Sequence, residues 1–424
     1  MTQANAYALP GMTEENIRLP RGAGDMISNV LMGAGALGIL LSIVAGATGM
    51  VEIKHAKISL LVGIVATLLP CVGALFFTMI FHLTNAGWSA TVRRQFENLM
   101  ATMWLPGLLM VFFIGSELAF PGKASSWLDT RMTDNGKEHL YVHKLPYLNV
   151  WFIFLRMILY VGILGFLCRM LWYFSTEQDR TGDKWLTKRA RFMSSWGVPV
   201  TALTTTFFAF DWLMALTDYH FYSTMWGVYF FAGSAFSVFA AVILTFALLK
   251  RTGKLSEGVV TEEHLHDLSK LMFGFTVFWG YIAFGQYFLI WYSNIPEETA
   301  WFDHRKEAYT TLTTFLAIGH FIIPFYILLW RPVRRNWTLI SIMAGWVLLM
   351  NVMDAYWILR PAVYTGSLLV DEGETAVGYV VDVVAIGSVV ALFVGVFMKR
   401  VASGPLVPTN DPRLPEALHH RNYV

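Results

Sequence analysis

Charge and cysteine are both scarce in this chain of 424 residues. Only 14% of the residues are charged, against about a quarter in an ordinary soluble domain. The two cysteines, Cys71 and Cys168, lie far apart inside apolar runs, which excludes a disulfide scaffold and a cysteine-rich metal site. No C-x-x-C-H string is present, so covalent haem attachment is excluded. The formal net charge of +2 and the absence of a basic run argue against nucleic acid as a partner.

Long apolar runs are abundant instead. A mean hydropathy of +0.52 and a hydrophobic content of 56% indicate a protein of the lipid bilayer. A bilayer core needs roughly 20 apolar residues as a helix. Continuous runs of that length predict an all-α polytopic membrane protein with ten transmembrane helices, at 27–49, 58–82, 101–120, 149–174, 192–216, 224–249, 271–293, 309–330, 337–360 and 378–398.

The distribution of basic residues predicts the orientation of the chain. Twenty-one of the 31 Lys and Arg residues fall on the side that holds both termini, nine fall on the other side, and Arg156 lies inside a helix. Positive charge near helix ends is retained in the cytoplasm. We therefore expect a cytoplasmic segment at 1–26, a membrane domain at 27–398 and a cytoplasmic tail at 399–424, with no cleaved signal peptide.

Ionisable residues inside the spans are the candidate functional residues, because they are costly in the bilayer. Five ionisable residues are expected at a similar depth, in the outer third of their helices, with Gln286 as a neutral companion. They are Glu117, Arg156, Asp211, Asp354 and Asp382. On the cytoplasmic half, His82 and His320 are the candidates for proton transfer.

Two interpretations of this outer layer carry about equal weight. The acids line one polar cavity that opens outward, with His320 as its deepest protonatable step, or each acid is satisfied locally by pairing and hydrogen bonds. One arginine cannot neutralise four acids. A lone guanidinium this far below the membrane surface would otherwise have to reach back to water, so we expect Arg156 to pair with one of the acids, Glu117 as first choice and Asp211 as second. No residue spacing in the chain predicts a metal site.

Several strings in the second half of the chain resemble one known family. They are DLSKLMFGFTVFWGYIAFGQYFLIWYSNIPEET at 267–299, FDWLM at 210–214, STMWGVYFFAG at 223–233, HFIIPF at 320–325, DAYW at 354–357 and Arg-Pro at 360–361. The stretch from about 205 to 361 resembles the ActF-type membrane subunit of bacterial alternative complex III. This family belongs with the polysulfide-reductase-like (NrfD-like) membrane subunits, whose fold is two four-helix bundles flanked by extra helices.

One string departs from that family. Its members usually read Leu-Asp-Pro-His-Trp-Phe between the fifth and sixth helices, whereas this chain has LTDYHFY at 216–222, one residue longer and without the proline. Asp218 and His220 remain from the motif, and the resemblance implies a place for them at an outer-face site.

The resemblance implies a subunit of a quinol-oxidising respiratory complex in the bacterial inner membrane. In the family, periplasmic partner subunits carry haem c and iron–sulfur clusters, and a second polytopic subunit is present. This chain would bind no metal or haem and would contribute a proton-conducting path or a quinone site. The alternatives are a structural anchor of the same complex and, less favoured, a self-sufficient proton-coupled secondary transporter.

Overall fold

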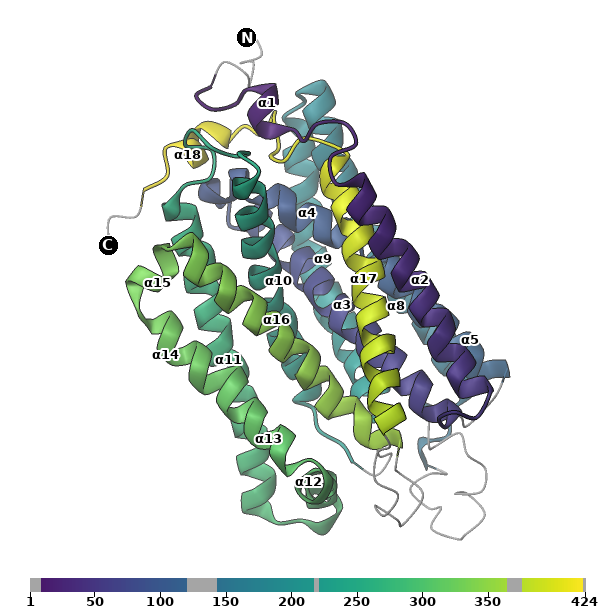
Figure 1. The fold of residues 1–424 in the computed structure, drawn as a ribbon. Helices are drawn as coiled ribbons and strands as arrows, with labels where there is room; N and C mark the ends of the chain where they lie inside the picture. The colour runs from purple at the N-terminus through teal and green to yellow at the C-terminus, as the bar shows by residue number, and fades with distance from the viewer. Residues whose placement is uncertain (1–8, 120–142, 217–220, 364–375, 422–424) are drawn as a thin grey trace.

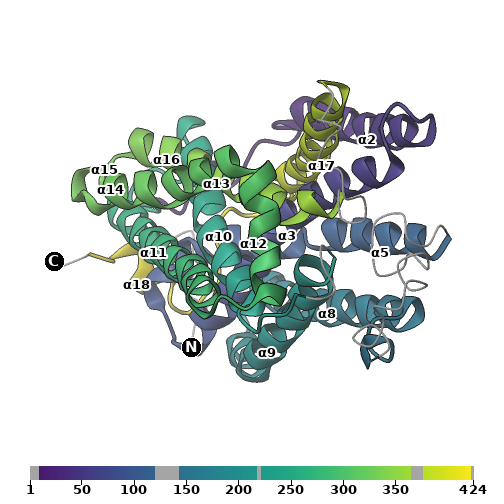
Figure 2. The ribbon, with the colours of Figure 1, turned by 90° about the horizontal axis from the view of Figure 1, so that it is seen from below.

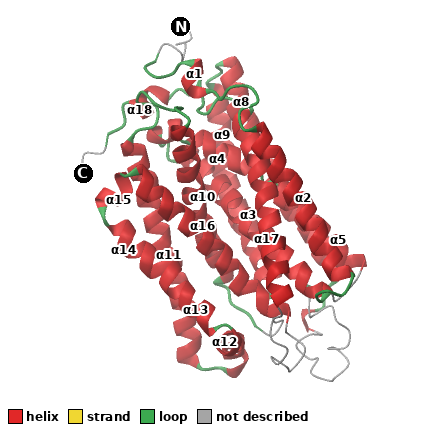
Figure 3. Ribbon diagram, viewed as in Figure 1, coloured by secondary structure: helices red, strands yellow, loops and turns green. Residues whose placement is uncertain are grey.

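The computed structural model describes residues 9–119, 143–216, 221–363 and 376–421. In these ranges the chain is helical and contains no strand (Figure 3). The main helices are α2 (Asp25–Ala47), α3 (Ile53–Leu83), α4 (Arg93–Ala101), α5 (Trp104–Ala119), α8 (Val150–Thr181), α9 (Trp185–Ala209), α10 (Trp226–Arg251), α11 (Glu262–Ser293), α12 (Pro296–Ala308), α13 (Thr310–Leu316), α14 (Ile323–Leu329), α16 (Trp337–Leu359) and α17 (Ala376–Ala402). Short helical segments are α1 (Glu14–Ile17), η2 (Gly87–Thr91), η4 (Phe210–Met214), η5 (Ala317–Ile322), α15 (Arg331–Arg335), η6 (Arg360–Val363) and α18 (Leu414–Leu418).

Nine helical segments among the described residues are long and apolar enough to cross a membrane. They coincide with nine of the ten runs expected from the sequence, which is consistent with a polytopic membrane protein. The remaining run, 192–216, is helical too, in α9 and η4, but it is not among the nine. Serines, threonines and Pro199 make this segment less apolar than the others.

Helix α3 lies at the centre of the bundle. Of its apolar window, 89% is buried, against 28% for the peripheral helix α2. It packs against α5 and α9 on one side and α10 and α16 on another, while α2 and α17 form a pair that covers a third side (Figures 1 and 2). Side chains on α3 can therefore reach partners on most of the other helices.

Small residues allow the closest helix contacts. A Cβ atom at Gly35 of α2 would lie 2.6 Å from the backbone oxygen of Ser388 on α17, and one at Gly73 of α3 would overlap the backbone oxygen of Ser234 on α10. Ser28 Oγ donates to the carbonyl oxygen of Gly395 at 2.7 Å. Backbone approach at small residues is the usual way in which helices associate in lipid.

Two helices contain a π-helical turn, in which the backbone N–H bonds five residues back. One is η4, which follows α9 and contains Asp211, and the other is η5, which joins α13 to α14 and contains His320. Pro324 follows η5, lacks an N–H and would crowd the carbonyl four residues earlier, which the wider turn relieves. Such turns are frequent at functional sites.

The two ends of the bundle carry different elements. Helices α1, α15 and α18 lie at one end, called here the α18 end (Figure 1). At the opposite end, called the α12 end, α12 is seen end-on in Figure 1 and along its length in Figure 2. It therefore runs across the end of the bundle, where it packs against α11 and α13.

Candidate functional site

The five charged residues singled out in the sequence lie towards the α12 end of their helices. Glu117 is near the end of α5, Asp211 follows α9 and Asp354 is in the last turns of α16. Arg156 and Asp382 are in the second turns of α8 and α17. All five side chains are buried.

Arg156 pairs with Asp211. Its Nε and Nη2 atoms each lie 2.9 Å from one oxygen of the Asp211 carboxylate, which is a bidentate ion pair. Tyr160 donates a further hydrogen bond to Asp211 at 2.8 Å, and Arg156 also donates to the carbonyl oxygen of Tyr147 at 2.8 Å. The first expectation, a pair with Glu117, was therefore wrong, and the second choice is the partner found.

Tyr147 covers this ion pair from the segment before α8. Its ring lies 3.8 Å from the guanidinium carbon of Arg156. Burial and, second, the nearby Asp211 carboxylate raise the pKa of the Tyr147 phenol to about 12. The phenol is therefore neutral at physiological pH, and the pair is closed off by a neutral aromatic side chain.

Glu117 pairs with Lys57 of α3 instead. The sequence placed the start of this helix at residue 58 and left Lys57 in a loop. In the structure α3 begins at Ile53, which puts Lys57 inside the helix and beside Glu117. The lysine Nζ also lies within 3.5 Å of the carbonyl oxygen of Ser116.

Asp382 is held by a cluster of four side chains. His55 Nε2 lies 3.0 Å and Arg360 Nη1 3.2 Å from its Oδ1 atom, and Tyr356 donates to Oδ2 at 2.9 Å. Ser59 donates to the same carboxylate. Three of the four acids thus have a basic partner, as the local-pairing interpretation expected.

Asp354 differs from the other three acids. Its Oδ1 atom accepts a hydrogen bond from the hydroxyl of Tyr229 on α10 at 2.6 Å. Among the described residues no Lys, Arg or His side chain forms an ion pair with it, although it is as deeply buried as the others. A carboxyl group in this setting can gain or lose a proton without breaking an ion pair.

Asp354 also lines a cavity of about 720 Å³. The walls come from α10, α11, α12, the α13–η5 segment and α16, and they are largely aromatic, with Trp226, Trp279, Phe302 and Trp357 among them. The exposed side chains of Phe284 and Trp291 line the same cavity, so it opens laterally on the surface of the bundle. This size lies within the usual range for small-molecule pockets.

Buried polar atoms on the cavity wall lack hydrogen-bond partners among the described residues. They include Nε1 of Trp226, a donor, and Oε1 of Gln286, an acceptor. Buried polar groups are nearly always satisfied by protein, water or ligand. Together with Asp354 they offer a donor, an acceptor and a carboxyl group to a polar ligand.

Arg305 anchors α12 beside the cavity. It is fully buried, and it donates to the carbonyl oxygens of Trp301 at 2.7 Å and Ile358 at 2.8 Å. Its guanidinium carbon lies 3.2 Å from the centroid of the Trp301 ring. Because Ile358 is in the last turn of α16, this contact fixes α12 against the helix that carries Asp354.

His320 lies directly behind the cavity wall. Its ring stacks on Trp279, with centroids 3.7 Å apart, and meets the edge of Phe236 at 4.7 Å. Neither ring nitrogen has a hydrogen-bond partner among the described residues. Trp279 lines the cavity, so one aromatic ring separates His320 from it.

The expectation of one cavity shared by four acids was wrong for three of them. Asp354 and Gln286 line the cavity, whereas Glu117, Asp211 and Asp382 contact basic side chains outside its lining. The physical reason is that each of the three has a basic side chain within reach on an adjacent helix or helix end.

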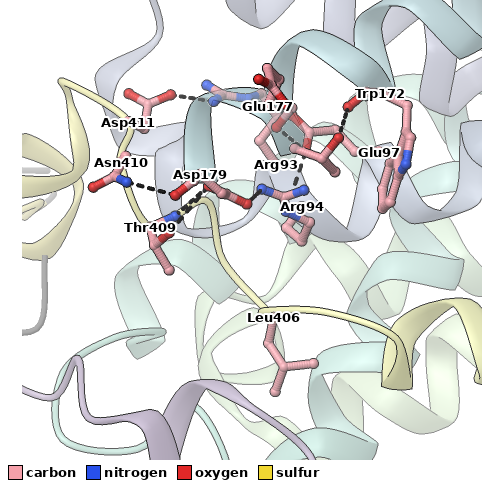
Figure 4. A network of polar contacts seen from close by, with 12 residues as sticks. Arg93, Arg94, Glu97, Trp172, Glu177, Asp179, Leu406, Thr409, Asn410 and Asp411 are labelled. Carbon is pink, nitrogen blue, oxygen red and sulfur yellow. Dashed lines mark hydrogen bonds and ion pairs between the residues drawn. The ribbon is translucent and has the colours of Figure 1, made fainter. Parts of the chain in front are cut away.

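A second buried charge cluster lies at the α18 end (Figure 4). Glu97 of α4 accepts from Arg93 Nε at 3.0 Å and from Ser175 Oγ at 2.6 Å, and Arg94 Nε lies 3.4 Å away. Arg93 also pairs with Asp411, and Arg94 with Asp179 of α8. We call these five charged residues the α18-end network.

His82, a proton-transfer candidate, lies at the edge of the α18-end network. It is buried at the end of α3 and interacts electrostatically with Arg93, Glu97 and Asp411. The structure thus places it in a different charged environment from His320.

The α18-end network holds the C-terminal segment on the bundle. Asp179 accepts a hydrogen bond from the backbone N–H of Thr409 at 2.8 Å, and its carbonyl oxygen accepts from Asn410 Nδ2 at 2.7 Å. Gln95 donates to the carbonyl oxygen of Leu406 at 2.8 Å. Burial acts to raise the pKa of Asp411, but the charge and hydrogen bond of Arg93 outweigh it, so this pKa is below its ordinary value.

Two predicted site residues, Asp218 and His220, lie outside the described residues. Among the residues that are described, no group of three His, Cys, Asp or Glu side chains could hold a metal ion.

Sequence reasoning missed several partners at the α12 end. Lys57, His55 and Arg360 were assigned to loops or helix ends, Tyr229 was not distinguished from other aromatic residues, and Arg305 was counted only as a loop charge. A signal for α12 was present, because Pro296 occupies its first turn, ahead of the Glu297–Glu298 pair.

No protein-family model matches this chain, and a search of curated proteins gives no match.

Proposed function

We propose that this chain is an integral membrane subunit of a quinol-oxidising respiratory complex and that the cavity beside Asp354 binds the quinol head group. The observation that carries the proposal is a buried carboxyl group, on the wall of an aromatic cavity, that has no basic partner among the described residues. The resemblance of residues 205–361 to ActF-type subunits supports the same class of protein.

The cavity suits an amphiphilic ring compound. Aromatic walls offer stacking surfaces for a quinol ring, and Gln286 Oε1 and Trp226 Nε1 offer one acceptor and one donor for its oxygens. The lateral opening, at Phe284 and Trp291, gives an isoprenoid tail a way out to the lipid.

Quinol oxidation releases two electrons and two protons. In this proposal Asp354 accepts the proton of one quinol hydroxyl, releases it to solvent and then accepts the proton of the other. Tyr229 holds the carboxyl group in place, and the two electrons pass to a redox centre of a partner subunit. His320, behind Trp279, is the next protonatable side chain, and His82 belongs to a separate site near the cytoplasmic surface.

The membrane, the number of spans and the orientation in this proposal are those expected from the sequence. The chain would cross the bacterial inner membrane ten times, with α9 and η4 as the fifth span, and both termini would be cytoplasmic. The packing supports two four-helix bundles, α3–α5–α8–α9 and α10–α11–α13/α14–α16, flanked by α2 and α17. Partner subunits, including periplasmic iron–sulfur and cytochrome c proteins and a second polytopic subunit, would carry the electrons.

A structural anchor is the second candidate. The ion pairs of Glu117, Asp211 and Asp382 favour it, because a fully paired acid needs no role beyond holding helices together. An anchor and a quinol site are compatible in one subunit, and the cavity distinguishes them.

Asp354→Asn in the intact complex tests the proposal. The amide can still accept from Tyr229 but cannot take up a proton, so turnover with quinol should fall by about a hundredfold. Asp303→Asn is the matched control, since Asp303 also lines the cavity but is exposed. Assembly is checked by co-purification of the haem-containing subunits.

Unchanged turnover in Asp354→Asn, with the complex assembled, would contradict the proposal. If the variant fails to assemble, Tyr229→Phe provides the second test, because it keeps the carboxyl group and removes only its hydrogen bond. Ion flux through the isolated, reconstituted chain would instead indicate a self-sufficient transporter.

A further inference from the structure

The first half of α9 is unusually basic. Lys184, Lys188, Arg189 and Arg191 lie within eight residues, and no Asp or Glu occurs between 184 and 210. Positions 188, 191, 192 and 195 recur at helical spacing, so they share one face of α9. This face turns towards the end of α3.

A groove of about 410 Å³ lies along that face. It is lined by Lys188, Arg191, Phe192 and Ser195 of α9 and by Leu83 of α3. Two basic side chains and two apolar side chains thus border the same hollow. The four α9 residues are exposed, which leaves the groove accessible from outside the bundle.

The basic charge in the groove is not compensated. Among the described residues, neither Lys188 nor Arg191 forms an ion pair; Lys188 lies over the Trp185 ring, 5.3 Å from its centroid. Two acids occur between 177 and 183 outside the α18-end network: the half-buried Glu177 of α8 is paired with Arg180, and the exposed Asp183 accepts a hydrogen bond from the backbone N–H of Trp185 at 2.8 Å. Elsewhere at this end of the bundle, buried arginines all meet carboxylates in the α18-end network.

Aromatic side chains place the groove at the level of a membrane surface. Phe192 is 73% exposed, and Trp185 and Trp196, one on each side of it along α9, are exposed as well. Exposed Trp beside Lys and Arg at the end of a membrane helix is typical of the boundary between lipid and water.

We infer that this groove binds the phosphate of an anionic phospholipid. Lys188 and Arg191 contact the phosphate, and Phe192 and Leu83 border the first carbons of the acyl chains. Basic pockets between helix ends are known to hold anionic lipid head groups. The apolar border favours a lipid over a free phosphate or an acidic protein. The inference does not depend on the proposed quinol site.

The test uses the purified full-length chain in detergent and native mass spectrometry. Phosphatidylglycerol and phosphatidylcholine with identical acyl chains are added in turn to wild type, to Lys188→Gln/Arg191→Gln and to a control, Arg180→Gln/Arg189→Gln. The control removes the same amount of positive charge from the same end of the bundle. It leaves the groove intact, because Arg180 is on α8 and Arg189 lies on a different face of α9 from the groove.

Wild type and the control should retain phosphatidylglycerol about tenfold better than phosphatidylcholine. The groove variant should bind the two lipids equally. Equal binding of both lipids by wild type, or unchanged preference in the groove variant, would overturn the inference.

Two further measurements complete the test. If the groove variant does not fold, the preference of wild type should still disappear as NaCl rises from 50 to 500 mM, and a salt-insensitive preference would overturn the inference. Displacement of phosphatidylglycerol by millimolar glycerol phosphate would show a site for free phosphate and would overturn the lipid assignment.

Discussion

The buried acidic residues have different partners at the two ends of this bundle. In the α18-end network every carboxylate meets an arginine, and the contacts join α4, α8 and the C-terminal segment. At the α12 end three acids are paired in the same way, but Asp354 meets a tyrosine and a cavity. The comparison separates acids that join helices through ion pairs from a buried carboxyl group that forms no ion pair with any described residue.

The largest expected effect comes from breaking the α18-end network. Glu97→Gln leaves Arg93 and Arg94 buried with one carboxylate fewer, which should lower the free energy of unfolding by about 3–5 kcal/mol. Equilibrium unfolding in mixed detergent micelles measures this. Glu14→Gln, at an exposed residue, is the control. A loss equal to that of the control would mean that the network does not hold the helices together.

The next prediction compares two acids at the α12 end. Asp211→Asn leaves the buried Arg156 without its bidentate partner and should cost about 3 kcal/mol of unfolding free energy. Asp354→Asn keeps an acceptor for Tyr229 and should cost less than about 1 kcal/mol. Similar losses in the two variants would remove the distinction drawn between paired and unpaired acids.

Lowering the pH should have a smaller effect on stability. Because the pKa of Asp411 is lowered in the folded chain, its ion pair contributes stability above an ordinary aspartate pKa of about 3.9 and loses it as the pH falls below that value. The protection of residues 403–418 against hydrogen exchange, taken relative to the intrinsic exchange rate at each pH, should therefore fall as the pH drops from about 4 to about 3.

Asp411→Asn is the matched variant for this pH dependence. Its protection against exchange should already be low at pH 6 and should depend less on pH than that of wild type. If wild type and the variant followed the same pH profile, Asp411 would not be the group that holds the C-terminal segment.

The smallest effect should come from a pair at the surface. Arg180 and Glu177 lie one turn apart on α8, and Arg180 is exposed. Solvent screens such pairs, so Arg180→Ala should leave the melting temperature almost unchanged. A large drop would show that exposed charge also fastens this end of the bundle.

Much of the fold could be predicted from hydropathy. Runs of about 20 apolar residues correspond to helices throughout the described chain, because a helix satisfies its backbone hydrogen bonds within one segment and needs about that length to cross the bilayer. Helix ends were less predictable, since hydropathy does not report where a helix begins. The start of α3 at Ile53, rather than at 58, is what brings His55 and Lys57 to the acids.

The candidate site was predictable only in part. Depth along the helices correctly brought the acids to one end, but sequence could not tell Asp354 from Asp211, because the difference lies in which helices face each other. Arg93 and Glu97 carried a signal in their spacing of four residues on one helix, which favours an ion pair.

The central claim, that the cavity beside Asp354 binds quinol, is tested most directly by photo-crosslinking. A photoreactive quinone analogue is added to the intact complex, and labelled peptides of this chain are identified by mass spectrometry. We expect label on α11 and the α13–η5 segment, at residues that line the cavity, and competition by excess quinol. Label confined to α5, α8 or α17, or no label on this chain, would contradict the account.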